Sequence, residues 1–316
     1  MREVSRRRRL RQHHSLYARP ANEMSFGPHL FLAFLEGTVT AFVLALTALG
    51  LSLVFGVMRI VNVAHGEFFM LGAVLAWYCT ALLGGSPMVG FALALIVAPL
   101  LVGAIALAAD WLVLKRVDYN PESTIVATIG LLYIVQQLVL TVFGPEARPV
   151  EAPIYFRVSF PWFGYSGYKL IVAALSALLL LGTWYALSHT KLGLYMRATQ
   201  QDYEIAQAFG VPVRRVYATV FALGAMLAAV AGVLIVPVQQ AHYLMGLDPL
   251  LLSFIVVIIG GLGSLKGTVV AAFVIGISDG MVSVFFSPTL AKILATLLVA
   301  AVLVVRPNGL FGDNRT

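Results

Sequence analysis

The stretch "GVMRIVNVAHGEFFMLGAVL", residues 56–75, places four polar or charged side chains between two long apolar runs. Arg59, Asn62, His65 and Glu67 fall within nine positions. An ionisable group at mid-membrane costs roughly 2.5 kcal/mol or more, so such a group usually faces a cavity or a partner. The stretch therefore predicts a break between two membrane segments.

The rest of the chain has the composition of a membrane protein. Of its 316 residues, 60% are hydrophobic and 11% are charged, and the mean hydropathy is +0.92. Soluble domains are about half apolar and about a quarter charged. Cys79 is the only cysteine, which excludes an intramolecular disulfide and a cysteine-based metal site. We predict an all-α fold, a polytopic bundle of transmembrane helices.

Apolar runs near the 20 residues needed to cross a bilayer predict eight or nine membrane segments. The segment at 250–262 is short, and "GGLGSLKGT" (260–268) interrupts the region after it, which predicts a broken or re-entrant element. Irregular backbone at this depth must be buried in protein or line a cavity. The candidate spans are 31–57, 67–84, 88–110, 124–143, 170–188, 214–238, 250–262, 268–287 and 290–306.

Lysine and arginine in short loops predict the orientation, because cytoplasmic loops carry an excess of them. The loop at 189–215 holds Lys191, Arg197, Arg214 and Arg215, so we expect it in the cytoplasm. Alternation then puts residues 144–169 outside, as a structured loop, and the N-terminus outside as well.

An arginine-rich tail, residues 1–24, conflicts with an external N-terminus. It holds seven arginines against two glutamates, and two interpretations stay open. The tail is a basic segment able to bind anionic lipid or nucleic acid, or translation starts at Met24. Residues 25–312 are expected to form a single transmembrane domain, followed by a short tail at 313–316.

Three polar residues of the opening stretch, Asn62, His65 and Glu67, have two candidate roles. Glu67 would lie near the start of the following helix, where the helix dipole favours a carboxylate and free backbone N–H groups need acceptors. We expect this capping role first and a place in a translocation path second. A zinc site would need a third ligand that the sequence does not offer, so we expect no metal and no cofactor.

Other polar residues inside predicted spans are Gln136, Gln137 and Asp279. Each could hydrogen-bond across helices, the commoner fate, or line a path. The glycine-rich "GGLGSLKGT" is not a phosphate loop, because Lys266 precedes Gly267 instead of following a glycine and preceding a hydroxyl. We therefore expect no ATP hydrolysis and no enzymatic activity from this chain.

Residues 202–210 predict a short amphipathic helix in the cytoplasmic loop. Tyr203, Ala206 and Phe209 or Gly210 share one face at helical spacing. Asp202 and Glu204 favour its N-terminal end, whereas Gly210 and Pro212 end it. Such a helix could lie on the lipid surface. Alternatively, a soluble partner could bind it and so move the two membrane spans that it connects.

Several motifs together resemble the LivH-type permeases, membrane subunits of branched-chain amino-acid ABC importers. "ALTALGLSLVFGVMRIVNVAHGEFFMLGA" (45–73) is similar to the family signature, with Val63 where phenylalanine is usual. "EIAQAFG" (204–210) looks like the ATPase-coupling motif of importer permeases, with Ile205 replacing alanine. "IIGGLGSLKGTVVAAFVIG" (258–276) and "VLVVRPNGLFG" (302–312) also match it.

The resemblance implies a multi-pass subunit of a bacterial inner membrane that forms half of a translocation path. Its implied partners are a second homologous permease, two cytoplasmic ATPase subunits, a periplasmic substrate-binding protein and membrane lipid, with no nucleic acid. The resemblance also implies that Glu204, Ala206 and Gly210 form the docking site for the ATPase. The implied substrates are branched-chain amino acids, while related permeases are assigned to urea, short amides and aromatic acids.

One alternative from another class stays open at this point. A self-sufficient secondary carrier or channel for a small solute would have the same composition. It would move solute through this chain alone, driven by a gradient, whereas an ABC importer subunit would need its ATPase.

Overall fold

The computed structural model describes residues 26–83, 86–306 and 309–311. The predictions for the tails at 1–24 and 313–316, and for a start at Met24, concern residues outside these ranges.

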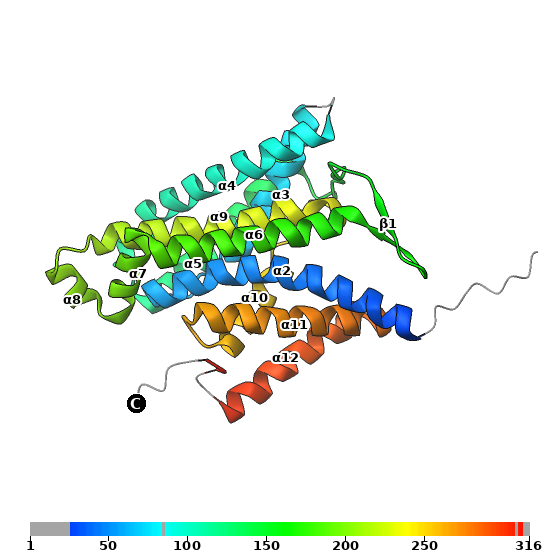
Figure 1. Cartoon of the computed structure of the whole chain (residues 1–316). Coiled ribbons are helices and arrows are strands. Elements are labelled where there is room, and N and C mark those ends of the chain that lie inside the picture. Colours follow the sequence, from blue (N-terminus) through cyan, green and yellow to red (C-terminus); the bar gives the residue numbers. More distant parts are fainter. Residues whose placement is uncertain (1–25, 84–85, 307–308, 312–316) are drawn as a thin grey trace, which may run out of the picture.

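Helices make up nearly all of the described chain (Figure 1). Every predicted span corresponds to a helix, and no boundary differs from the expected one by more than five residues. The elements are α2 (Phe26–Met58), α3 (His65–Leu82), α4 (Pro87–Leu112), η1 (Leu114–Val117), α5 (Pro121–Phe143), β1 (Arg157–Ser159), β2 (Gly164–Ser166), α6 (Gly167–His189), α7 (Lys191–Gln201), α8 (Tyr203–Ala208), α9 (Val213–Gln239), α10 (Leu247–Gly260), α11 (Leu265–Phe285) and α12 (Pro288–Val305).

Seven of the helices in the described ranges are long and apolar enough to cross a membrane. They are α2, α4 with η1, α5, α6, α9, α11 and α12. Two further apolar segments do not meet this description: α10 has only 14 residues, and α3, with 18 residues, carries His65 and Glu67 in its first turn. The chain is therefore a multi-pass membrane protein with one short segment among its longer helices.

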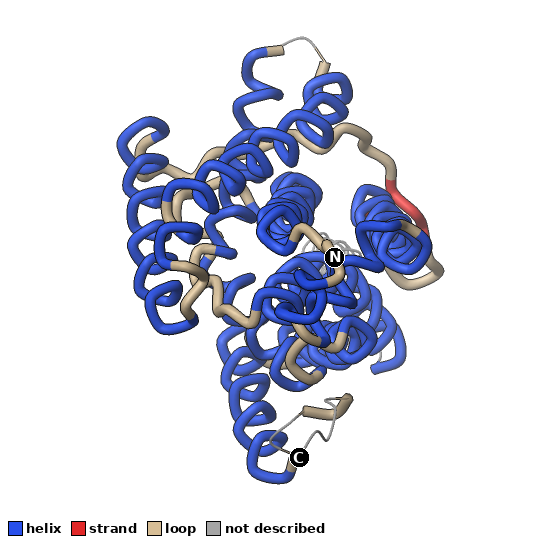
Figure 2. Tube along the Cα trace, turned by 90° about the vertical axis from the view of Figure 1, so that its left-hand side faces the viewer, coloured by secondary structure: helices blue, strands red, loops and turns tan. Residues whose placement is uncertain are grey.

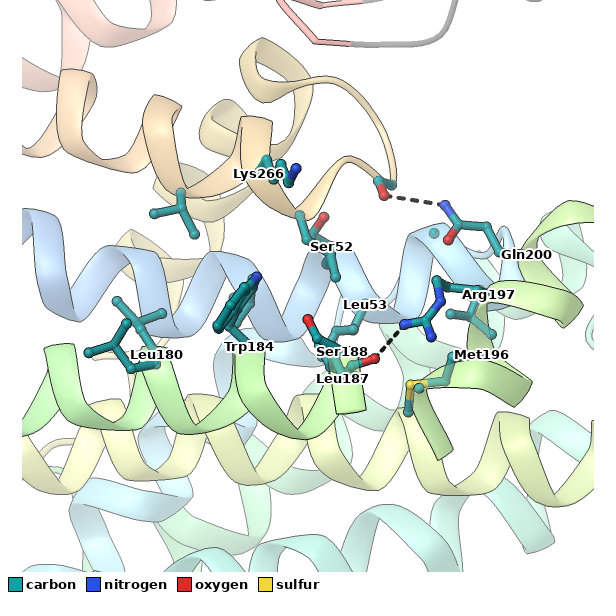
Figure 3. Close-up of a pocket in the computed structure, with 18 of the residues that line it drawn as sticks. Ser52, Leu53, Leu180, Trp184, Leu187, Ser188, Met196, Arg197, Gln200 and Lys266 are labelled. Carbon is teal, nitrogen blue, oxygen red and sulfur yellow. Dashed lines mark hydrogen bonds between the residues drawn. The ribbon is translucent and has the colours of Figure 1, made fainter. Parts of the chain in front are cut away.

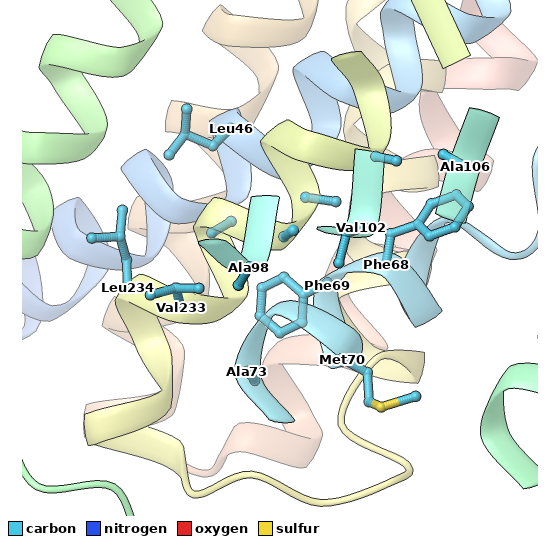
Figure 4. Packing of buried hydrophobic residues seen from close by; sticks show 14 of the residues in the cluster. Leu46, Phe68, Phe69, Met70, Ala73, Ala98, Val102, Ala106, Val233 and Leu234 are labelled. Carbon is cyan, nitrogen blue, oxygen red and sulfur yellow. The ribbon is translucent and has the colours of Figure 1, made fainter. Parts of the chain in front are cut away.

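Helix α2 occupies the centre of the bundle (Figures 1 and 2). It packs against α9 on one side and α11 on the other; α3 and α4 join the α9 side, while α10 and α12 join the α11 side. Buried side chains of Leu46, Phe69, Val102 and Leu234 bring α2, α3, α4 and α9 together (Figure 4). Helices α5, α6 and α12 lie at the periphery, and most of their apolar surface stays uncovered.

Small residues allow the central helices to approach closely. Gly50 of α2 faces Gly224 of α9, and a Cβ added to Gly50 would lie 2.5 Å from the Gly224 carbonyl oxygen. Helices in a bilayer associate through such close packing, because lipid tails remove the usual hydrophobic driving force between them.

One end of the bundle carries α7 and α8, and we call it the basic end. Helices α2, α4, α6 and α12 end there, and α5, α9 and α11 begin there (Figure 1). Most lysines and arginines of the described chain lie at this end: Arg59, Lys115, Arg116, Lys191, Arg197, Arg214, Arg215, Lys266 and Arg306.

The opposite end carries the loop at 144–169, which contains the antiparallel hairpin of β1 and β2. Two backbone hydrogen bonds, 2.7 and 2.8 Å long, join Arg148 of this loop to Ala241, just after α9. An ion pair of 2.7 Å between Lys169 and Glu36 joins the start of α6 to α2. The loop is thus structured, as predicted, and fixed to the bundle.

Candidate functional site

The predicted break in the opening stretch lies between the end of α2 at Met58 and the start of α3 at His65. Arg59 has a φ of 55°, a left-handed conformation that is costly for a residue with a side chain. The chain then turns back from the basic end into the bundle, so that α3 begins beside the middle of α2, where His65 contacts Thr47.

Thr128 of α5 supports the backbone of this non-helical segment. Its hydroxyl oxygen accepts a hydrogen bond from the Val63 N–H at 3.2 Å, and the hydroxyl is 2.9 Å from the Thr124 carbonyl, to which it can donate. Irregular backbone at membrane depth needs such partners, since lipid supplies none.

Replacing Thr128 by valine keeps the shape of the side chain and removes this acceptor. The Val63 N–H loses its partner, so we expect the free energy of unfolding to fall by about 1–3 kcal/mol. The apparent melting temperature of the purified protein measures the loss. Thr183→Val is the matched control, because the Thr183 hydroxyl bonds only to the Leu179 carbonyl of its own helix. Equal melting temperatures of the two variants would contradict the role of Thr128.

Asn62, His65 and Glu67 are all buried. The Asn62 Oδ1 accepts from the Ala64 N–H at 3.1 Å, so Asn62 stabilises the turn that leads into α3. The His65 Nε2 is 2.9 Å from the Thr47 carbonyl oxygen of α2. A carbonyl can only accept, so Nε2 carries the proton and donates it.

The capping contact expected for Glu67 is not formed. Helix α3 has no side-chain cap, and both carboxyl oxygens of Glu67 lack a hydrogen-bond partner among the described residues. Glu67 does lie in the first turn of α3, where the helix dipole favours it. The structure therefore bears out the predicted position of Glu67 but not its expected hydrogen bonds.

The start of α3 meets the start of α10 inside the bundle. Gly66 and Gly246 are in backbone contact, and a Cβ on either would collide with the carbonyl oxygen of the other. Two helix N-termini, each with a partial positive charge, thus converge at depth. Transporters often place such short or interrupted helices at the solute path.

A cavity of about 450 Å³ lies beside this meeting point, on the side of the opposite end. Asp279, predicted from the sequence as a polar residue within a span, lines it and is half-buried. Asp248 and Lys292, not singled out from the sequence, also line it and form an ion pair of 2.5 Å. Further lining residues are Thr40, Leu44, Thr47, Phe69, Ile235, Gln239, His242 and Leu252.

Two predicted residues lie elsewhere. Gln136 is half-buried and Gln137 exposed on the peripheral helix α5, and neither lines this cavity. The described residues contain no group of three His, Cys, Asp or Glu side chains that could hold a metal ion. The cavity wall combines charged side chains with apolar ones.

The predicted cytoplasmic helix is α8. The Asp202 carboxylate accepts from the N–H groups of Glu204 and Ile205, both at 2.9 Å, which caps the helix. Gly210, with a φ of 83°, ends the segment in a conformation that only glycine adopts freely. These features match the predicted start and stop.

The predicted apolar face of α8 is only partly buried. Ala206 is 5% exposed, but Tyr203 is 51% and Phe209 is 85% exposed. Ile205 is also exposed, as is Glu204. Helix α7, which precedes α8, was missed because its sequence "KLGLYMRATQQ" is polar. The segment thus presents apolar side chains outward at the basic end, where no described part of the chain covers them.

A hollow of about 810 Å³ lies behind α8, between this helix, the turn after η1 and the start of α9. Tyr119 and Tyr217 pack edge to face in its wall, with ring centres 4.9 Å apart. Burial raises the pKa of the Tyr119 hydroxyl, so that group stays protonated and donates to Asp110 at 3.5 Å. Helix α8 contributes Tyr203 and Gln207 to this hollow.

Comparison with known proteins identifies the family of this chain. A family profile described as "Branched-chain amino acid transport system / permease component" matches residues 33–304. The chain belongs to this family of ABC transporter permeases. The resemblance noted in the sequence is confirmed.

Two relatives and one solved structure illustrate the similarity. The permease is 28% identical over 307 residues to the high-affinity branched-chain amino acid transport system permease protein LivH of Escherichia coli (strain K12), covering 89% of this chain and 96% of LivH. It is 24% identical over 303 residues to BraD of Pseudomonas aeruginosa, covering 90% and 96%. PsaBC from Streptococcus pneumoniae in complex with Fab has a TM-score of 0.48 and 14% identity, covering 87% and 92%.

Proposed function

We propose that this permease forms half of the solute path of an importer in a bacterial inner membrane. Its solute would be a branched-chain amino acid or a related small polar molecule. The family and the names of the relatives support this class. The cavity near Asp279 supports it too, because Asp248, Asp279 and Lys292 offer charges for an amino and a carboxylate group beside apolar walls.

The exposed apolar surface of α8 is the observation that supports docking of an ATPase. Phe209 and Ile205 project from a capped helix whose two ends lead to spanning helices α6 and α9. Exposed aromatic side chains on a rigid element are typical anchors of protein interfaces. A partner bound to Glu204, Ala206, Gly210 and their neighbours would move both spans together.

The remaining proposed partners are those of ABC importers in general. A second homologous permease would complete the path, two ATPase subunits would act on α8 of each half, and a periplasmic binding protein would deliver solute. The concentration of lysine and arginine at the basic end supports a cytoplasmic location for α8. The loop at 144–169 would then lie on the periplasmic side.

Reconstitution into liposomes tests the proposal directly. The permease alone should neither move radiolabelled leucine nor hydrolyse ATP, while the assembled complex with its ATPase, second permease and binding protein should do both. Gradient-driven uptake by this chain alone would instead establish a secondary carrier. A panel of leucine, urea, a short amide and an aromatic acid identifies the solute class.

A further inference from the structure

A largely apolar groove of about 560 Å³ runs between α2, α6 and α11 toward the basic end (Figure 3). Most of its wall is aliphatic, and Trp184 of α6 lies along it. The aliphatic side chains include Leu49, Leu53, Leu180, Leu181 and Val270.

Two basic side chains line the groove, Arg197 of α7 and Lys266 of α11, and its lining contains no aspartate or glutamate. They lie apart along it, with Lys266 nearer Trp184 and Arg197 nearer Met196 and Gln200 (Figure 3). Neither cation has a carboxylate within 4.0 Å among the described residues. Arg197 donates to the Leu187 carbonyl, which holds its guanidinium at the mouth of the groove. Lys266, in the "GGLGSLKGT" stretch, also lies in the first turn of α11, where the helix dipole favours an anion.

We propose that this groove binds an anionic phospholipid from the leaflet at the basic end. One acyl chain lies along the leucine side chains, and the two cations, Arg197 and Lys266, attract the anionic headgroup. Basic pockets between membrane helices recognise anionic headgroups in this way.

The position of the groove fits a lipid better than a solute. Helix α6 is mostly exposed, and on it Leu181 and Trp184 are 63% and 56% exposed. Acyl chains are thus the surrounding medium at this wall. Apart from Ser52 and the indole N–H of Trp184, a polar solute would find side-chain hydrogen-bonding groups only at Ser188, Arg197, Gln200 and Lys266.

Quenching of Trp184 fluorescence measures the binding. The other three tryptophans are replaced by phenylalanine, and the full-length chain, assembled with its partner subunits, is placed in lipid nanodiscs. The emission of the same complex carrying Trp184→Phe is subtracted, so that the remaining signal is that of Trp184. Brominated phosphatidylglycerol should quench Trp184 at a lower mole fraction than brominated phosphatidylcholine. A charge near an anionic surface contributes about 1 kcal/mol, so Arg197→Gln and Lys266→Gln should each raise the half-quenching fraction about fivefold.

Lys191→Gln is the matched control, since Lys191 is an exposed cation at the same end that does not line the groove. It should leave the half-quenching fraction unchanged. Equal quenching by the two lipids would overturn the proposal. The two lipids are compared on the chain that keeps both Arg197 and Lys266, so the result does not depend on how the variants fold. Protection of Trp184 from both lipids would also overturn it, because a protein partner would then cover the groove.

Discussion

Replacing Gly66 by alanine is expected to cause a large loss of stability in this permease. The added methyl group collides with the Gly246 carbonyl oxygen and comes within 2.9 Å of the Leu250 Cβ, so α3 and α10 must separate. Overpacking of this kind costs about 1–3 kcal/mol, and backbone atoms on both sides leave little room to relax. The apparent melting temperature of the purified protein, or its failure to accumulate, measures the effect.

Gly130→Ala provides the control for this experiment. Gly130 lies within α5, and a Cβ there meets nothing within 4 Å. Alanine is the better helix former by about 1 kcal/mol, so this variant should be neutral or slightly more stable. If Gly66→Ala melted at the same temperature as Gly130→Ala, the close contact of the two helix starts would be refuted.

Replacing Phe209 by alanine is expected to cause the largest loss of transport. Its ring, 85% exposed on the permease alone, is the candidate anchor for the ATPase. Interface anchors contribute about 2 kcal/mol or more, which corresponds to a roughly thirty-fold weaker association. Solute uptake and uptake-linked ATP hydrolysis should fall together in liposomes at limiting ATPase concentration, and excess ATPase should restore both.

Phe286→Ala is the matched control, because Phe286 is 74% exposed at the opposite end, after α11. It should leave uptake unchanged. A second variant, Gly210→Val, tests the shape of the segment rather than its anchor. Valine at a φ of 83° costs about 1–3 kcal/mol, so the segment should shift and ATP hydrolysis should lose its coupling to uptake. Normal uptake by both Phe209→Ala and Gly210→Val would exclude docking through α8.

The sequence predicted the helical segments well because each one is a long apolar run. It predicted the break at 59–64 for a related reason, since charged residues interrupt such a run. It missed α7, whose polar sequence reads as a loop until the fold places it against α2, α6 and α9. Contacts between residues that are distant in the sequence produce no local sequence pattern. The ion pair of Asp248 and Lys292 was therefore not predicted.

The details of the polar residues were harder to predict. Glu67 has the residue type and position of a capping residue, yet its oxygens have no partner, because capping depends on side-chain direction rather than on spacing. The meeting of the starts of α3 and α10 was also not predicted, since it depends on backbone contact between Gly66 and Gly246, which are far apart in the sequence.

The two hydrogen bonds between Arg148 and Ala241 have a mechanical consequence. They tie the loop at 144–169 to residues 241–246, which lead directly into α10 and contribute His242 and Met245 to the cavity wall. A displacement of this loop by a bound protein would therefore pull on residues 241–246 and change the shape of the cavity.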